Sequence, residues 1–160
     1  MAAADFHLKI KDLEGESKQK GYENQLQLSS WSWGAQNAGS MGVGTGGGTG
    51  KVSMQDFHFN ITMGKHTPLA MKYCASGKHF DEGVLTCRRA GDTPQKYLVV
   101  TFNELVISSY QTSGHGDGLP EDSIAFNYTK IKMEYYAQDE KGKAGSAITG
   151  AFDVKSGEAK

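Results

Sequence analysis

Residues 24–36, NQLQLSSWSWGAQ, form the stretch that most clearly sets the fold. Apolar and polar residues alternate in it, which is the two-residue period of a β-strand with one buried face. The alternation changes phase between Leu28 and Trp31. A bulge at the two intervening serines would return all the apolar side chains to one face. We therefore predict a bent strand with Trp31 and Trp33 in the core.

The same period recurs along most of the chain. Phe57, Phe59 and Ile61 share one face of the next strand, so Phe57 and Phe59 are predicted core residues as well. The phase shifts again between Tyr128 and Ile131, which predicts a second bulge. Besides residues 24–36, the predicted strands cover residues 6–11, 51–63, 83–89, 95–103, 105–111, 124–135 and 148–154.

One segment departs from the strand period and predicts a helix. Thr67 has the chemistry of a helix cap and Pro68 suits the first helical position, while Gly77 suits the end. We therefore predict a mainly β fold. It is a β-barrel of two curved antiparallel sheets with one short flanking α-helix, about residues 68–76, and a long glycine-rich loop. A length of 160 residues suits a single domain spanning 1–160.

The glycine run, residues 39–50, contains a string that satisfies G-x-G-x-x-G. That motif binds a pyrophosphate only where it follows a strand and opens a helix, whereas this run leads into a predicted strand at Lys51. The end of the run also imitates a phosphate loop. It fails because Thr45 stands where the first glycine is needed and Val52 follows the lysine. We predict a partner-contact loop, with no nucleotide or other cofactor bound.

Charge and composition exclude several classes of protein. Seventeen Lys and Arg against eighteen Asp and Glu leave no basic excess for nucleic acid. No apolar run is long enough to suggest membrane insertion. The residues after Met1 lack the basic and apolar segments of a secretory signal. We expect synthesis and folding in the cytoplasm, and any release from the cell to need no cleaved signal peptide.

No catalytic or metal-binding constellation is apparent. The five histidines show no ligand spacing, and the adjacent carboxylates Asp81-Glu82 and Glu121-Asp122 are expected to supply charge at loop edges. Ser108-Ser109 lacks the glycines of a nucleophile elbow. Cys74 and Cys87 are too few for a disulfide scaffold and are expected to be buried free thiols, although the sequence leaves their redox state open. We predict that the protein is not an enzyme.

Several short segments occur together and in order along the chain. They are WSWG at 31–34, the glycine run, GKVSMQDF at 50–57, TPL at 67–69, CASGKH at 74–79, LTCRRAG at 85–91, VISSY at 106–110 and IAFNY at 124–128. In these segments the chain resembles the haemolysin-coregulated protein (Hcp) family, the tube proteins of type VI secretion systems. The resemblance implies homohexameric rings, stacked into a tube that is expelled from the cell and that carries or chaperones small effectors in its lumen. It also implies sheath, spike and effector proteins as partners. We expect the plain tube subunit, without the C-terminal toxin extension that some family members carry.

The resemblance also gives residue-level expectations. If Trp31 and Trp33 face the core, Ser30 and Ser32 face away, and by similarity to the family that side lines the lumen. The glycine run corresponds to the loop that joins one ring to the next, and its central residues are Gly42, Val43, Gly44, Thr45, Gly46, Gly47 and Gly48. The alternative class is a monomeric β-barrel that carries a small ligand. The native mass distinguishes the two, since the chain itself weighs 17.3 kDa.

Overall fold

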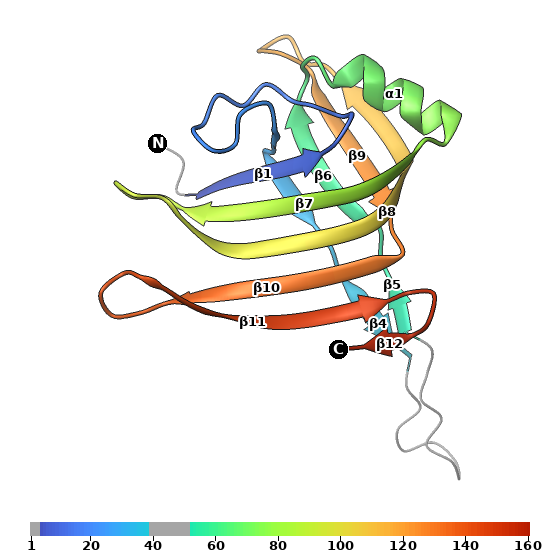
Figure 1. Cartoon of the computed structure of the whole chain (residues 1–160). Helices are drawn as coiled ribbons and strands as arrows, with labels where there is room; N and C mark the ends of the chain where they lie inside the picture. The colour runs from blue at the N-terminus through green and yellow to red at the C-terminus, as the bar shows by residue number, and fades with distance from the viewer. Residues whose placement is uncertain (1–3, 39–51) are drawn as a thin grey trace.

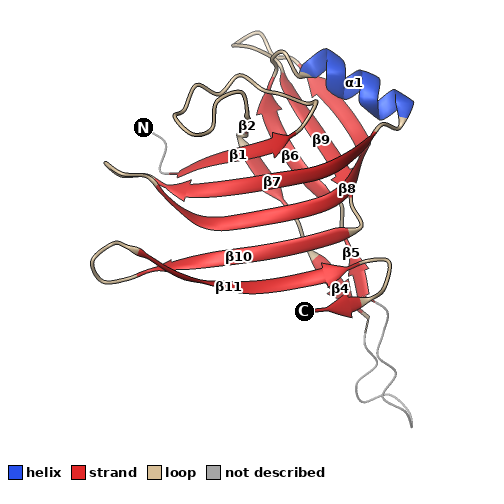
Figure 2. Ribbon diagram, in the orientation of Figure 1, coloured by secondary structure: helices blue, strands red, loops and turns tan. Residues whose placement is uncertain are grey.

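The computed structural model describes residues 4–38 and 52–160, and these form antiparallel β-strands with one helix (Figure 1, Figure 2). The predicted mainly β class is confirmed. In chain order the elements are β1 (Ala4–Ile10), β2 (Leu26–Gln27), β3 (Ser30–Ser32), β4 (Ala35–Asn37), β5 (Val52–Met54), β6 (Phe57–Thr62), α1 (Thr67–Ser76), β7 (His79–Arg89), β8 (Gln95–Ser113), β9 (Glu121–Asn127), β10 (Lys130–Gln138), β11 (Ala144–Asp153) and β12 (Glu158–Ala159).

Ten of the strands form two layers that share β8, while β4 and β5 pair with each other in a separate two-stranded sheet. The first layer has the order β12-β11-β10-β8-β7-β1-β2, and the second continues from β8 through β9 and β6 to β3. The strand β8 pairs with β10 over Leu98 to Asn103 and with β9 from Val106 onward. Between these two pairings Glu104 takes a left-handed conformation, with φ of 55°. The sequence predicted two strands here, whereas the structure has one bent strand that stays paired with β7 on both sides of the bend.

Within residues 4–38 and 52–160 the hydrogen-bonded ladders do not close into the predicted barrel. The short strand β2 pairs with β1 in the first layer, and β3 pairs with β6 in the second. Between them, Leu28 N donates to Phe6 O at 2.9 Å and Ser29 N donates to Asn60 O at 2.8 Å. The chain therefore crosses from one layer to the other at the two serines where a bulge was predicted. A two-residue period marks buried faces but does not show whether a sheet closes, so the sequence could not settle this point.

The second predicted bulge is also a crossing between layers. Tyr128 and Thr129 separate β9 from β10, and Thr129 N donates to Asn103 O at 3.0 Å. A bulge and a corner shift the side-chain phase in the same way, because each changes the face that the following residues present. The prediction located the irregularity correctly but assigned it to one continuous strand.

Aromatic rings fill the space between the two layers. Phe57, Phe59, Phe102 and Phe126 are each at most 1% exposed, and their ring centroids lie 5.0–6.3 Å apart in tilted and edge-to-face pairs. Such pairs stabilise a core beyond the area they bury. The interior of the sheets is therefore packed with side chains.

The helix α1 begins one residue earlier than predicted and has a different cap. His66 is the capping residue, and Thr67 is already helical. The Thr67 hydroxyl accepts a bond from Gly64 N at 3.1 Å and donates to the Asp122 carboxylate at 2.6 Å, so its polar group is used in a tertiary contact. The predicted end is confirmed, because Gly77 takes the left-handed conformation with φ of 69° and donates to Tyr73 O.

Candidate assembly surfaces

The two predicted core tryptophans lie at the edge of the core. Trp31 stacks on Phe57 with a centroid distance of 6.0 Å and meets Phe6 edge-on at 6.2 Å. The Trp33 indole N–H donates to the Tyr128 hydroxyl. Both indoles are only half-buried, whereas Phe57 is 1% exposed. The tryptophans therefore close one side of the interior and also reach the surface.

Ser30 and Ser32 are exposed on the opposite side of β3. Ser30 lies opposite Asn60 of β6, whose side-chain amide donates to the serine hydroxyl at 2.9 Å, and Ser32 lies opposite His58. Ser123 of β9 continues the row beyond Asn60. Around Ser30 and Ser32 this face of the second layer therefore carries uncharged polar groups with the histidine neutral, and its carboxylate, Glu121, lies at the far end opposite Thr62.

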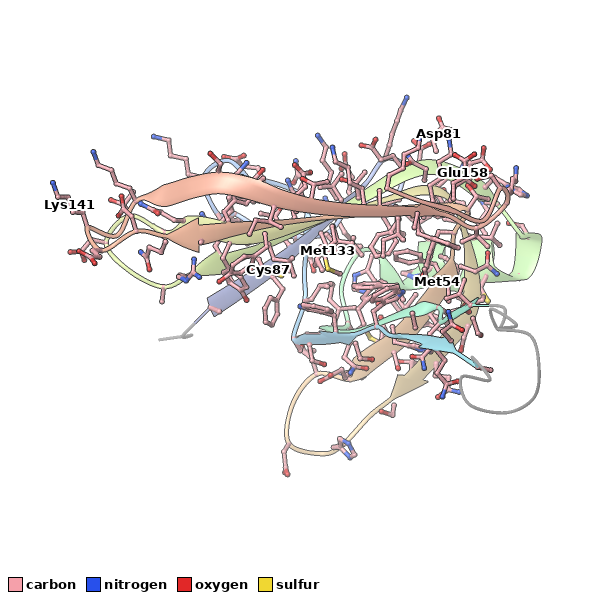
Figure 3. The ribbon with its side chains drawn as sticks, turned by 90° about the horizontal axis from the view of Figure 1, so that it is seen from below. Met54, Asp81, Cys87, Met133, Lys141 and Glu158 are labelled. Carbon is pink, nitrogen blue, oxygen red and sulfur yellow. The ribbon has the colours of Figure 1, made fainter. Side chains whose placement is uncertain are left out.

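A second surface is apolar. Leu98, Tyr135 and Ile148 lie directly opposite one another on β8, β10 and β11, so their side chains share one face of the first layer. We call these three residues the ledge. It is the same face that packs against the second layer elsewhere, but Tyr135 is 42% and Ile148 72% exposed. Figure 3 shows why, since β10 and β11 project past the second layer.

A groove adjoins the ledge where the two layers separate. It holds about 220 Å³ and its lining includes Trp33, Met54, Met133 and Phe152. Met133, on β10 of the first layer, and Met54, on β5 of the two-stranded sheet, border this space and are labelled in Figure 3. Methionine side chains adapt to irregular partners, and they are common at protein-binding surfaces. The ledge and groove together form a continuous apolar strip.

The outer edge of β11 is unprotected over most of its length. In the described residues, β12 pairs only with Phe152 and Asp153, and Ala151 exchanges backbone bonds with Lys160. Residues 144–150, AGSAITG, therefore present backbone groups on the side opposite β10. They include no charge and no proline, which are the features that usually block pairing at a sheet edge. This edge is suited to accept a strand from another chain.

Titratable groups are buried elsewhere, and they stabilise the fold. Asp122 is fully buried, accepts a bond from Thr67, and lies within 2.9 Å of His66 Nε2 and 3.3 Å of the Tyr110 hydroxyl. The expectation that Asp122 supplies charge at a loop edge is therefore wrong, although Glu121 is exposed. Burial lowers the pKa of His66 despite the neighbouring carboxylate. Only the alternating pattern of Ile124 and Phe126, extended back to the start of β9, could have indicated this inward carboxylate.

His7 of β1 occupies a similar buried position, against the loop between β1 and β2. Its Nε2 lies 2.9 Å from the Ser17 hydroxyl, and its ring stacks on Tyr22 at 4.8 Å. The guanidinium of Arg88 covers the same tyrosine and forms two hydrogen bonds to Asp5, at 2.6 and 2.9 Å. Burial lowers the pKa of His7. These contacts attach the loop to the sheet.

Neither cysteine is arranged for chemistry. Both are free, with Cys87 buried and Cys74 half-buried, and burial raises the pKa of Cys87 to about 11. Within residues 4–38 and 52–160 no group of three His, Cys, Asp or Glu side chains could hold a metal ion. In the same ranges no helix has the length and apolar character needed to cross a membrane. The expected contact loop, Gly42 to Gly48, lies outside the described residues.

A packed core with an uncovered apolar strip and an uncharged free edge is typical of a structural subunit that binds other protein chains. Comparison with known proteins gives the class. The family model described as "Type VI secretion system effector, Hcp" matches residues 7–135. Protein hcp1 of Pseudomonas aeruginosa is 38% identical over 157 residues, which cover 96% of each chain.

Solved structures agree with this assignment. Hcp1 from Salmonella typhimurium has a TM-score of 0.82 at 30% identity, with 99% of this chain and all of that chain covered. A second structure, titled as a type six secretion system protein, has a TM-score of 0.92 at 27% identity with the same coverage. The chain belongs to the Hcp family of type VI secretion tube proteins, as the sequence predicted.

Proposed function

We propose that this protein is the repeating subunit of a type VI secretion tube, acting as a homohexameric ring that stacks on identical rings. It is non-catalytic and uses no cofactor, and it functions with sheath, spike and effector proteins. The observation that carries the proposal is the apolar ledge beside an uncharged free edge, in a chain of a tube-protein family. A tube subunit must bury part of its surface against copies of itself, and this strip is apolar surface that the chain's own second layer leaves uncovered.

The packed interior disfavours the alternative of a monomeric ligand carrier. A carrier barrel holds its ligand between the sheets, in a cavity large enough for a small molecule. Here Phe57, Phe102 and Phe126 occupy that space with centroids about 5 Å apart. A ligand would have to displace the core that holds the two layers together.

The native mass tests the proposal. Six chains of 17.3 kDa give about 104 kDa, so light scattering after size exclusion should show that species for the purified wild-type protein. The mass should persist through a dilution series, because a closed ring buries two surfaces of every subunit. A stable species of 17.3 kDa would contradict the proposal and favour the carrier.

The polar face of the second layer is the proposed lumen side. Ser30 and Ser32 carry no charge and lie on the short strand β3, which pairs with β6, so small effectors would meet an uncharged, hydrogen-bonding surface there. Ser32→Arg should leave the ring mass unchanged and alter effector loading, because it adds charge without touching the core. His115→Arg, in the exposed loop between β8 and β9, is the control. Loss of rings in Ser32→Arg would contradict the placement.

The proposal extends to stacking and export. The run from Gly42 to Gly48 is the proposed contact between rings, and deleting it should leave single rings that no longer stack. Unchanged tube formation by the deletion variant would count against that role. In this scheme the subunit folds in the cytoplasm and leaves through the secretion machinery without a cleaved signal peptide.

A further inference from the structure

We propose that the loop of residues 11–25 is held against the first layer by neutral His7 and is released when that histidine takes up a proton. The loop joins β1 to β2, and from the end of β1 it folds back along that strand (Figure 1). We call His7 together with Ser17 and Tyr22 of the loop the latch. The latch lies within one chain and needs no neighbouring copy, so it is independent of the proposed ring.

The latch joins two side chains of the loop to two strands of the first layer. His7 Nε2 of β1 lies 2.9 Å from the Ser17 hydroxyl, and the His7 ring stacks on Tyr22 at a centroid distance of 4.8 Å. The guanidinium of Arg88, on β7, lies over the same tyrosine ring at 4.4 Å. His7 is 0% and Arg88 6% exposed. The loop is therefore attached through a buried imidazole whose charge depends on pH.

The hydrogen bonds around Ser17 assign a neutral form to His7. The Ser17 hydroxyl oxygen accepts a bond from Gln19 N at 3.2 Å, so its proton is available to the imidazole. His7 Nε2 is then the acceptor, and the ring proton is on Nδ1, which lies 3.5 Å from Asp5 Oδ1. The other neutral form would direct a lone pair at that carboxylate. A protonated ring would be a second donor and would leave the buried serine proton without its acceptor.

The charges around His7 also oppose its protonation. In the part of the chain that the structure describes, the charged or titratable groups that face the ring are Asp5 of β1, Arg88 of β7 and Tyr22 of the loop, while its cross-strand neighbours Gln27 and Thr86 are uncharged. Asp5 accepts two hydrogen bonds from Arg88, so their charges compensate each other. A proton on His7 would therefore add one uncompensated positive charge to a buried cluster. Burial lowers the pKa of His7 against the opposing effect of Asp5, and Arg88 lowers it further.

Acid therefore favours release of the loop. In the open state water reaches the His7 ring, whose pKa returns to its ordinary value of about 6.5, above that of the closed state. The open state gains population as the pH falls below that value, until the pH passes the pKa of the closed state. Backbone bonds from Gly15 N to Asn24 O at 2.9 Å and from Asn24 N to Ser17 O at 2.8 Å join only the two arms of the loop. A short hairpin that has lost its packing surface is marginally stable in water, so the released loop loses these bonds as well.

Hydrogen exchange of the full-length protein tests the latch. The readout is the protection of residues 11–25 divided by that of residues 98–102 in β8, a strand paired on both sides. Between roughly pH 7.5 and 5 this ratio should fall about tenfold, with an upper limit of about 30-fold for an open-state pKa of about 6.5. The side-chain carbonyl of His7→Gln can accept from Ser17 but takes up no proton, so this variant should keep a constant ratio. His115→Gln, at an exposed histidine between β8 and β9, is the control and should respond as the wild type does.

Three outcomes would overturn the latch. They are a ratio that does not change with pH in the wild type, an equal fall in His7→Gln, and a constant ratio in His115→Gln. Ser17→Ala gives a separate check if His7→Gln does not fold, because it keeps the histidine and removes the hydroxyl. Its loop should be poorly protected already at neutral pH while residues 98–102 stay protected, and full protection of the loop would overturn the latch. The native mass enters none of these results, so the latch and the ring can fail separately.

Discussion

Phe57 lies where the aromatic side chains of both layers converge, so its truncation measures how the core holds the fold. The ring is 1% exposed and contacts Phe102 and Phe126 at centroid distances of 5.0 and 5.1 Å, with Trp31 and Phe59 at 6.0 and 6.1 Å. Phe57→Ala removes the whole ring and leaves a cavity between β6, β8 and β9. None of the four neighbours can fill it without leaving its own partners.

The cost follows from burial and packing. Burying a phenylalanine side chain stabilises a protein by about 1.5–3 kcal/mol, and an unfilled cavity raises the cost of Phe→Ala to about 3–5 kcal/mol. For a chain of this length each kcal/mol lowers the melting temperature by about 2–4 °C. Phe57→Ala should therefore melt roughly 6–20 °C below the wild type. Phe57→Leu keeps most of the volume and should cost only about 1–1.5 kcal/mol.

Urea unfolding at matched protein concentration is the assay, because association of subunits adds to apparent stability. Ring mass is measured alongside, since the core lies away from the ledge and the free edge and rings should still form. A loss below about 1 kcal/mol in Phe57→Ala would refute the reasoning. It would show that the two layers close around the cavity left by Phe57, and that the contacts between the aromatic side chains do not stabilise the fold as described.

Three further results are expected. Gly15→Ala should destabilise the protein by about 2 kcal/mol or more, because a Cβ there would lie 2.5 Å from Gln25 O. The control Gly116→Ala has open space around the added Cβ and should leave the stability unchanged. Equal melting temperatures of the two variants would contradict this expectation. Because burial lowers the pKa of His66 and His7 below 6.5, stability should be complete above that pH. As the pH falls below 6.5, the unfolded chain takes up protons before the folded chain does. The free energy of unfolding should therefore decrease by up to about 1.4 kcal/mol per pH unit for each histidine, until the pH passes the pKa values of the folded state. His66→Gln should reduce this slope in urea titrations between pH 7 and 5 (roughly the histidine range), and an unchanged slope would argue against the assignment. Cys87, with its raised pKa of about 11, should react with a thiol reagent only after unfolding, whereas rapid labelling of the native ring would contradict its burial.

Much of the fold was visible in the sequence because strands with one buried face leave a clear two-residue period. The faces of β6, with Phe57 and Phe59 inward, could be read directly, and so could the end of α1 at Gly77. Corners between layers were harder, because a change of phase at Ser29-Ser30 or after Tyr128 has the same pattern whether a strand bulges or passes to the other layer. Only the structure therefore shows that the strand ladders stay open between the two layers.

Long-range polar contacts explain the remaining differences. Thr67 was predicted as a helix cap, but its hydroxyl bonds to Asp122, 55 residues away in the chain. The residues of the ledge were equally hidden. Tyr135 and Ile148 fit the pattern of core positions, and only the extent of the second layer shows that they are uncovered. Burial of a strand face depends on what lies opposite, which local sequence does not contain.

The most direct test of the central claim is an image of the purified wild-type protein. Negative-stain micrographs should show rings whose class averages have six-fold symmetry, alone or stacked end to end. Particles of a single chain, without rings at any concentration at which the protein stays soluble, would contradict the account.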